Sequence, residues 1–287
     1  MSNPLISVII VLYNSENVLP KAIKSLNKLT YDNLEVILVD NASDRKYEQS
    51  DLDCRFSRSY HHLKSNIGFG QGCNFGAEKA KGEYLFFVNP DARPEPESLQ
   101  ILVDVLEQNS KIAAVGPQLL FDNGSLMPSY RFKPDFGRLL FSRNSPLSSF
   151  PIFSGFTSRY IAPPLKILSE VEVVPATALL VRKSAFDAVR GFDKRYFMYA
   201  EDFDLCVMLG KAGYKVYHQP DAIVYHTWGK GAQADRKSLA LEHNRSIFRF
   251  YRKHYPSNLI RSSLLYILLL IRKLLIIIGI SKPGEIS

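Results

Sequence analysis

Residues 83–91 read EYLFFVNPD, a continuous apolar run that ends on an acidic residue, Asp91. Two earlier runs have the same character: ISVIIVLYN at 6–14, and LEVILVDNAS at 34–43, which carries Asp40 near its end. Continuous apolar strands are typical of parallel sheets that are covered on both faces. Open α/β sheets bind their ligands beyond the carboxyl ends of the strands. The sequence therefore predicts an α/β fold with a mostly parallel sheet, and places Asp40 and Asp91 at its ligand-binding edge.

Segments with helical periodicity separate these strands. Residues 15–29 are predicted to form a helix with Ser15 as a candidate cap, and residues 72–82 and 98–109 carry further helical patterns. Another apolar strand is predicted at 112–120. This alternation indicates repeated βα units, with helices flanking a central sheet.

The second half of the chain is less regular. Residues 122–170 are rich in Pro, Ser, Phe and Arg and have no sustained period. We interpret them as a functional loop or lid, because long loops in compact domains are usually functional or disordered. Helical spacing resumes after the adjacent acids Glu201 and Asp202, a position where capping and the helix dipole alone favour acidic residues. A short strand is predicted at 215–227 and ends at His226.

Length and composition favour one α/β domain with a tail, since 287 residues are long for one domain and short for two. The three cysteines, Cys54, Cys73 and Cys206, are odd in number and far apart, which predicts neither a disulfide framework nor a zinc site and indicates a reducing cytosol. The amino terminus lacks a basic region followed by an apolar signal core, so we expect no export signal.

The carboxyl-terminal tail, residues 236–287, is predicted to associate with a membrane. Residues 258–280 read NLIRSSLLYILLLIRKLLIIIGI, and at 100° per residue Arg261 and Arg272 point almost the same way, with Lys273 about a third of a turn away. The broad apolar face predicts an amphipathic helix in the membrane interface, with its basic residues drawn to anionic lipid. A helix docked on the core or on a partner subunit and a membrane-spanning helix are the alternatives. Basic residues from Arg236 onward are interleaved with this apolar sequence. We therefore do not attribute the net charge of +8 to binding of nucleic acid, and we expect no nucleic-acid partner.

Several enzyme classes are excluded because their sequence motifs are missing or incomplete. The segment NIGFGQGCN at 66–74 departs from G-x-G-x-x-G because Cys73 takes the place of the third glycine. No G-x-x-x-x-G-K-[ST] or G-x-S-x-G sequence is present. A nucleotidyltransferase would need a basic phosphate-activating loop where the chain has SVIIVLYNSEN. A non-catalytic scaffold would keep the fold, but it would have no need of acids at every reactive position.

Taken together, several segments resemble the inverting glycosyltransferases of family 2, in particular their rhamnosyltransferase-like and galactofuranosyltransferase-like branch. The matching segments are SVIIVLYN, VDNAS, N-x-GFG-x-G-x-N, GEYLFFVNPDA, GFD-x-x-YFMYAEDFDLC and the closing His226-Thr-Trp-Gly, over roughly residues 5–230. The resemblance implies a GT-A fold, a nucleotide-sugar donor and Mg²⁺ or Mn²⁺. It also implies a catalytic domain at 1–235, with donor binding by 1–120 and acceptor binding by 121–235.

The resemblance implies roles for residues on the donor side. Asp40 would accept a hydrogen bond from the imide N–H of a pyrimidine base, with an Asx turn as the structural alternative. Backbone groups from Val11 to Tyr13 would contact the nucleoside. Asn66 and Gly68 would shape the loop under the base and ribose, or form a simple turn.

The implied metal site departs from the family's D-x-D motif. Asp91 corresponds to its last acid, but the first position is Asn89 and the middle one is Pro90. Asn89 offers an oxygen without a charge, so the protein would hold the metal less tightly and the diphosphate would hold it more. His226 would be the second protein ligand, with a structural hydrogen-bonding histidine as the alternative.

The remaining chemistry falls to the two adjacent acids. Asp202 would be the general base that deprotonates the acceptor hydroxyl in a single inverting displacement. Glu201 would hydrogen-bond the sugar or acceptor, and Asp204 would be a helix-start residue. Four basic residues could meet a diphosphate or remain solvated surface charges: Lys230, Arg236, Lys237 and Arg245.

The expected reaction is transfer of L-rhamnose from dTDP-rhamnose to a lipid-diphosphate-linked saccharide, in bacterial O-antigen or other surface-polysaccharide assembly. UDP-galactofuranose and UDP-hexose are the alternative donors. The expected location is cytoplasmic, peripherally associated with the inner face of the cell membrane.

Overall fold

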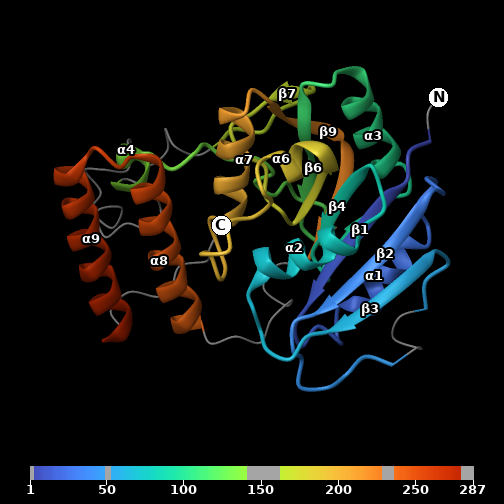
Figure 1. The fold of residues 1–287 in the computed structure, drawn as a ribbon, viewed down its shortest axis with the longest axis horizontal. Helices are drawn as coiled ribbons and strands as arrows, with labels where there is room; N and C mark the ends of the chain where they lie inside the picture. The colour runs from blue at the N-terminus through green and yellow to red at the C-terminus, as the bar shows by residue number, and fades with distance from the viewer. Residues whose placement is uncertain (1–2, 49–52, 141–161, 228–235, 279–287) are drawn as a thin grey trace.

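The computed structural model describes residues 3–48, 53–140, 162–227 and 236–278. At its centre is a nine-stranded sheet in the order β3-β2-β1-β4-β8-β6-β9-β5, with β7 paired to β9 (Figure 1). The strands are β1 (Ile6–Leu12), β2 (Leu34–Asp40), β3 (Ser57–His62), β4 (Tyr84–Val88), β5 (Ala92–Pro94), β6 (Ile112–Leu120), β7 (Ser169–Glu170), β8 (Ala178–Arg182) and β9 (Lys215–His226). The helices are α1 (Leu19–Leu26), α2 (Phe69–Lys79), α3 (Ser98–Gln108), α4 (Phe136–Leu140), α6 (Lys183–Ala188), α7 (Glu201–Lys211), α8 (Arg236–His254) and α9 (Leu259–Ile277).

The predicted α/β architecture is confirmed, although the sheet is mixed. Strands β1 to β4 pair in parallel, as do β6 and β9. Strand β8 runs antiparallel to both neighbours, and β5 and β7 run antiparallel to β9. Ala178, the first residue of β8, pairs with Val88, the last residue of β4. A strand that starts where its neighbour ends must run in the opposite direction, and an apolar pattern does not reveal this direction.

Both faces of the sheet are buried, as the continuous apolar runs predict. Along β1, the side chains of Ile6, Val8 and Ile10 join one core cluster, and those of Ile9 and Val11 join the other. Helices α1 and α3 pack on the first face, and α2, α6 and α7 pack on the second. The three cysteines are free and buried, as expected.

Helix α1 is shorter than predicted and begins at Leu19. Pro20 lies in its first turn, where a residue without an N–H is tolerated. The carbonyl of Ser15 accepts hydrogen bonds from the amides of Val18 and Leu19, so a turn precedes the helix. The side chain of Ser15 hydrogen-bonds the backbone of Tyr13 and does not cap the helix.

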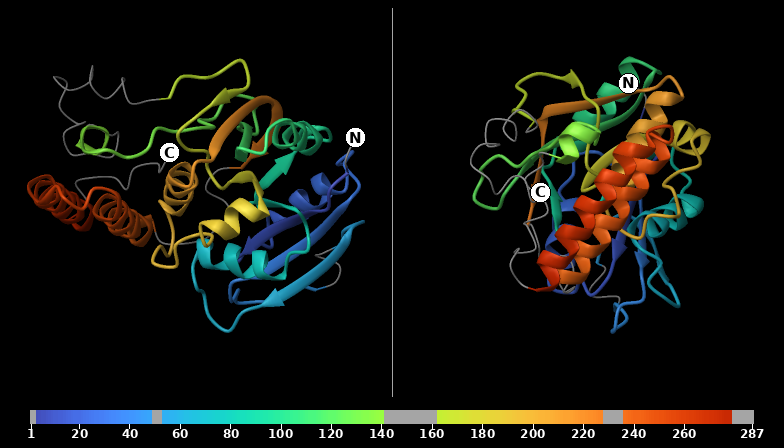
Figure 2. Two further views of the ribbon diagram at one scale, coloured as in Figure 1. Left: turned by 45° about the horizontal axis from the view of Figure 1, so that its top comes forward. Right: turned by 90° about the vertical axis from the view of Figure 1, so that its left-hand side faces the viewer.

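Helices α8 and α9 form a hairpin at the end of the molecule far from β1–β3, with α9 outermost (Figure 1). Figure 2 shows the two helices packed along their length. Many apolar side chains of α9 and its carboxyl-terminal end are exposed: Leu259, Ile260, Leu264, Tyr266, Ile267, Leu270, Ile271, Leu274, Ile277 and Ile278. Within the described residues, no helix combines the length and hydropathy needed to cross a bilayer.

The basic residues of α9 have different surroundings: Arg272 faces the protein, whereas Arg261 and Lys273 are exposed. Arg272 is buried against α8, where its guanidinium donates to Asn244 Oδ1 at 2.6 Å. The guanidinium of Arg261 lies over the ring of Phe136 in α4, 5.7 Å from its centroid. These arginines find partners on the protein, and the apolar stripe is left outside.

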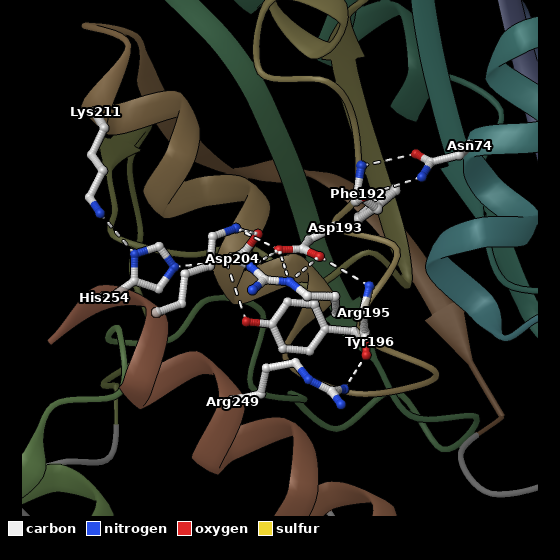
Figure 3. A network of polar contacts seen from close by, with 10 residues as sticks. Asn74, Phe192, Asp193, Arg195, Tyr196, Asp204, Lys211, Arg249 and His254 are labelled. Carbon is white, nitrogen blue, oxygen red and sulfur yellow. Dashed lines mark hydrogen bonds and ion pairs between the residues drawn. The ribbon is translucent and has the colours of Figure 1, made fainter. Parts of the chain in front are cut away.

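A polar network fastens α8 to α7 (Figure 3). Asp204, in the first turn of α7, is 1% exposed, and its carboxylate accepts hydrogen bonds from His254 Nε2 and Lys253 Nζ, each at 2.7 Å. Lys253 also pairs with Asp193 at 2.8 Å, and the Tyr196 hydroxyl lies 3.4 Å from Asp204. Asp204 is therefore at the helix start, as predicted, and its side chain also holds the carboxyl-terminal hairpin in place.

Replacing Asp204 with alanine should lower the free energy of unfolding by about 3 kcal/mol, because removing one partner leaves the others buried and uncompensated. Urea denaturation followed by circular dichroism measures this loss. Asp187→Ala is the matched control, since the Asp187 side chain is 55% exposed and pairs with Lys183 on the surface, so its loss should cost less than about 1 kcal/mol. Equal effects of the two substitutions would contradict the anchoring role of Asp204.

Candidate active site

The two predicted metal ligands lie together at one edge of the sheet. Ala92 in β5 pairs with His226 at the end of β9. This pairing brings His226 Nε2 to 3.1 Å from Asp91 Oδ1, and both side chains are largely buried. Asn89 begins the turn that presents Asp91, since its carbonyl accepts a hydrogen bond from the amide of Ala92. Sequence and structure therefore agree on the position of this pair.

The donor set at this point fits a divalent cation. Carboxylate oxygen and imidazole nitrogen both ligate Mn²⁺, and carboxylate oxygen ligates Mg²⁺. Among the described residues, no group of three His, Cys, Asp or Glu side chains could hold an ion. Asp91 and His226 would thus be its protein ligands, and the other positions would be left to a diphosphate and water.

Strand β8 brings the acids of α7 to the same edge. The amide of Asn89 donates to the carbonyl of Thr177 at 2.9 Å, just before β8 begins. The neighbouring residue Ala176 gives a backbone hydrogen bond to the carboxylate of Asp202. The segment before β8 thus contacts the Asn89–Asp91 turn on one side and Asp202 on the other.

The two adjacent acids have different environments. Glu201 is buried, and its Oε2 has no hydrogen-bond partner among the described residues. Burial, together with the neighbouring Asp202 carboxylate, raises the pKa of Glu201 to about 8. Burial also raises the pKa of Asp202, but the Arg131 guanidinium and the N–H groups of Phe203 and Ala176 oppose this shift. The groups that favour ionisation act mainly on Asp202, so Asp202 is the better candidate for a base and Glu201 is the acid whose protonated form is more favoured.

Arg131 is a site residue that the sequence reasoning missed. It lies in the irregular segment 122–170, where no periodicity singles out a residue. Its backbone N–H donates to the carbonyl of Val173 at 2.9 Å, which ties the segment to the strand-like stretch before β8. Its guanidinium is close enough to Asp202 to affect that residue's pKa. Residues 141–161 of the same segment lie outside the described residues.

The loop containing Asn66 and Gly68 is held by side-chain hydrogen bonds, as predicted for a shaped loop. Asn66 Oδ1 accepts from Asn41 Nδ2 at 2.8 Å and from the amide of Gly68 at 2.9 Å. Asn41 also accepts from the amide of Ile67 at 2.9 Å. Asn41, which the sequence reasoning did not select, therefore organises this loop from the end of β2.

This loop contacts the segment that leads to the two acids. The carbonyl of Phe197 accepts from the amide of Phe69 at 2.9 Å, directly beside Gly68. Gly68 has φ +88°, and a Cβ there would lie 2.2 Å from the same carbonyl. Tyr199 and Ala200, immediately before Glu201, both have the left-handed conformation, with φ of 69° and 65°. Non-glycine residues rarely adopt the left-handed conformation unless their surroundings enforce it. The contact with the loop that contains Asn66 and Gly68 therefore helps to fix the positions of Glu201 and Asp202.

Asp40 occupies the predicted strand end but is closed to a ligand. Its side chain is fully buried, and its oxygens accept from the Ser43 amide at 2.9 Å, the Tyr60 hydroxyl at 2.5 Å and His62 Nδ1 at 2.8 Å. Burial would raise the pKa of Asp40, but the hydrogen bonds from Tyr60, Ser43 and His62 hold it below its ordinary value. The turn that the sequence left as an alternative is the observed role, and direct contact with a base is not available in this structure. Tyr60 and His62 lie on β3, which was not predicted.

Three further residues were candidates for substrate binding: Val11, Tyr13 and Arg245. Val11 is buried in β1, and its backbone pairs with Val39 of β2. The N–H and C=O of Tyr13 both hydrogen-bond the Ser15 hydroxyl, which leaves the half-buried Tyr13 side chain at the sheet edge. Arg245 is exposed and pairs with Glu242 in α8, as expected of a solvated surface charge. Lys230 and the Trp-Gly end of the closing motif lie outside the described residues.

Comparison with known proteins identifies the family. The profile described as Glycosyl transferase family 2 matches residues 7–161, more than half of the chain. The chain belongs to glycosyl transferase family 2. The protein is therefore a glycosyltransferase, and the edge that carries Asp91, His226 and Asp202 is its candidate active site.

Two curated relatives of this family 2 glycosyltransferase match along most of their length. The N-acetylglucosaminyl-diphospho-decaprenol L-rhamnosyltransferase of Mycobacterium tuberculosis is 29% identical over 255 residues, which cover 85% of this chain and 82% of the relative. Rhamnosyltransferase WbbL of Escherichia coli K12 is 26% identical over 277 residues, which cover 88% of this chain and 96% of the relative.

Solved structures confirm the GT-A fold. GalNAc-T7 with UDP, GalNAc and Mn²⁺ has a TM-score of 0.65 at 16% identity; the match covers 87% of this chain and 48% of GalNAc-T7, so the chain spans about half of that protein's length. The mannosyltransferase PcManGT of Pyrobaculum calidifontis, in complex with GDP-Man and Mn²⁺, has a TM-score of 0.59 at 14% identity over 97% of this chain and 74% of that protein. At these identities the likeness shows the fold alone.

Gly68→Ala should destabilise the enzyme and weaken binding of a nucleoside diphosphate, because the new methyl group would displace Phe197. Gly124→Ala is the matched control, since Gly124 also has a positive φ, +80°, but a methyl group added there would have nothing within 4 Å. Backbone strain alone should cost the control about 1–2 kcal/mol, and Gly68→Ala should cost about 1–3 kcal/mol more through overpacking. Thermal unfolding with and without dTDP measures both effects. Equal losses of stability in the two variants would refute the importance of the close contact between Gly68 and Phe197.

Proposed function

We propose that this family 2 enzyme transfers L-rhamnose from dTDP-rhamnose to a lipid-diphosphate-linked saccharide during assembly of O-antigen or another bacterial surface polysaccharide. The observation that carries this proposal is the similarity to two rhamnosyltransferases through most of both chains, including the region after the catalytic sheet. The name of the mycobacterial relative describes an acceptor sugar on a diphospho-lipid. UDP-galactofuranose and UDP-hexose are the alternative donors on this fold.

In this proposal, residues 1–120 bind the donor, and His226 joins Asp91 of this half to hold the metal. Asp91 and His226 would ligate Mg²⁺ or Mn²⁺, and Asn89 adds a neutral oxygen nearby. The bound cation would neutralise the charge that develops on the leaving nucleoside diphosphate. Because Asn89 carries no charge, the protein's hold on the cation would depend mainly on Asp91 and on the diphosphate itself.

Asp202 would act as the general base on the acceptor side, within residues 121–235. It would take the proton from the acceptor hydroxyl while that oxygen attacks the anomeric carbon on the face opposite the diphosphate, so that the configuration inverts. Arg131 supports this role by stabilising the ionised form of Asp202. Glu201, whose protonated form is favoured by burial and by Asp202, would donate a hydrogen bond to the sugar or the acceptor.

The tail, residues 236–287, would place the enzyme at the cytoplasmic face of the membrane. α9 and its carboxyl-terminal end carry many exposed large apolar residues, and exposed apolar surface of this kind marks interaction sites for proteins or membranes. We infer that this patch enters the membrane interface, with the hairpin lying between the bilayer and the catalytic domain. Burial of apolar area would then supply much of the attraction, because Arg272 is buried against α8 and Arg261 contacts Phe136.

Asp202→Asn should lower kcat for transfer by about 10²–10⁴-fold, the usual contribution of a general base. Its affinity for dTDP with Mn²⁺ should stay near that of the wild type. Glu201→Gln is the matched comparison: it mimics the protonated acid and should lower kcat less than about tenfold. The assay follows dTDP release from dTDP-rhamnose with a lipid-diphosphate-linked N-acetylglucosamine. Turnover near wild type in Asp202→Asn would refute the base assignment, and absence of transfer by the wild type with dTDP-rhamnose would refute the donor assignment.

Replacing Ile267 and Leu274 together by aspartate should weaken binding to phospholipid vesicles by at least about tenfold, because two exposed apolar side chains of α9 would no longer enter the bilayer. Co-sedimentation with vesicles measures this binding. Ile167→Asp is the control, since Ile167 is equally apolar and exposed but lies outside the hairpin. If the double variant binds vesicles as the wild type does, α9 is not the membrane-binding surface.

A further inference from the structure

A buried arginine in the hairpin lacks a counter-charge. Arg272 is 5% exposed, and among the described residues no carboxylate lies within ion-pair distance of it. Its Nη1 donates to Asn244 Oδ1 at 2.6 Å and lies 3.4 Å from His243 Nδ1, and both partners are uncharged side chains on α8. A guanidinium has five N–H donors, and the described residues offer no acceptor to Nε and Nη2. Neither of these atoms is among the buried side-chain atoms that lack a partner, so both can be reached from outside the protein. An anion supplied by a ligand could therefore pair with them.

His243 connects this arginine to the acids of the active site. The His243 ring lies 5.5 Å from the ring of Tyr199, two positions before Glu201. Burial, then Arg272 and Arg131, lower the pKa of His243 to about 3. Arg131 is also the cation that opposes the rise in the pKa of Asp202. Tyr199 and His243 thus connect the segment that precedes the two acids to Arg272 in the hairpin.

Arg131 also has guanidinium N–H groups without a hydrogen-bond partner among the described residues, although the Asp202 carboxylate is near enough to interact with its charge. Its guanidinium lies 5.9 Å from the ring centroid of Phe203, and it makes no hydrogen bond or ion pair to a described side chain. Arg245 is different, because it is exposed and paired with Glu242. The guanidinium groups of Arg131 and Arg272 both have N–H donors without partners among the described residues. Phosphate supplies the matching negative charge and acceptors, and arginine can bind it through two parallel hydrogen bonds.

We propose that Arg272, with Arg131, His243 and Asn244, binds the diphosphate of the lipid-linked acceptor. This inference rests on the proposed function. The order of groups in the protein matches the order along such an acceptor: the base faces the sugar hydroxyl, the arginines face the diphosphate and the apolar stripe of α9 faces the hydrocarbon. α9 therefore contributes to acceptor recognition as well as to membrane contact.

Steady-state kinetics with two acceptors test the assignment. Both carry N-acetylglucosamine and an undecyl chain; one joins them through a diphosphate, and the other through a simple glycosidic bond. In detergent, Arg272→Gln should raise KM for the diphosphate acceptor about 10- to 100-fold, as expected when a charge-assisted hydrogen bond is lost. KM for the neutral acceptor should not change. Arg272→Lys should restore part of the loss, because the charge returns without the planar fork.

Arg261→Gln is the matched control, since Arg261 lies on the same helix, is exposed and contacts Phe136. Its KM for both acceptors should equal that of the wild type. An equal KM increase for both acceptors in Arg272→Gln would overturn the inference in favour of simple helix packing, and unchanged KM values would overturn it outright. Reduced binding of this variant to anionic vesicles, with its preference for the diphosphate acceptor intact, would assign Arg272 to a lipid headgroup instead.

A second measurement needs no variant and holds if Arg272→Gln does not fold. Undecyl diphosphate without a sugar should compete with the diphosphate acceptor for the wild-type enzyme, and undecanol should not. Equal inhibition by both compounds would overturn the inference. Wild-type transfer to the neutral acceptor would still uphold the proposed function in that case, whereas transfer to neither acceptor would reject the proposed function itself.

Discussion

The active site depends on the antiparallel pairing of β8 with β4. Ala178 pairs with Val88, so the chain enters β8 at the edge where β4 ends. The residues just before β8 therefore contact both the Asn89–Asp91 turn and Asp202. The proposed metal ligand Asp91 and the proposed base Asp202 come from distant parts of the sequence and lie at one edge because this strand runs between them. The β5–β9 pairing completes the arrangement by placing His226 against Asp91.

The carboxyl groups near this edge of the sheet differ in how readily they ionise, because their surroundings differ. Glu201 and Asp202 are neighbours, but burial favours the protonated form of Glu201, whereas Arg131 and backbone N–H groups favour the ionised form of Asp202. Asp40 has three hydrogen-bond donors of its own and serves the fold. The same logic extends to Arg272, whose positive charge has no described counter-charge. The position of an acid or base on the sheet edge thus indicates little until its partners are known.

Much of this could be predicted from the sequence, and the exceptions have physical reasons. Continuous apolar runs predict the buried strands, and resemblance to a family predicts the pairing of Asp91 with His226. Strand β3 reads SRSYHH and lacks an apolar pattern, so the donors that close Asp40 could not be foreseen. Arg131 comes from an irregular segment. Helical periodicity places Arg261 and Arg272 on one stripe of α9, but it does not say whether that stripe faces protein or lipid.

The proposed mechanism has one central step, in which Asp202 deprotonates an acceptor that attacks opposite a diphosphate held on the Asp91–His226 side. A single displacement of this kind inverts the anomeric carbon. The most direct test is the anomeric configuration of the transferred sugar, measured by NMR on product isolated before it can equilibrate. We predict a configuration opposite to that of the sugar in the donor. Retention of the donor configuration would contradict this mechanism, because it requires two displacements or attack from the same face.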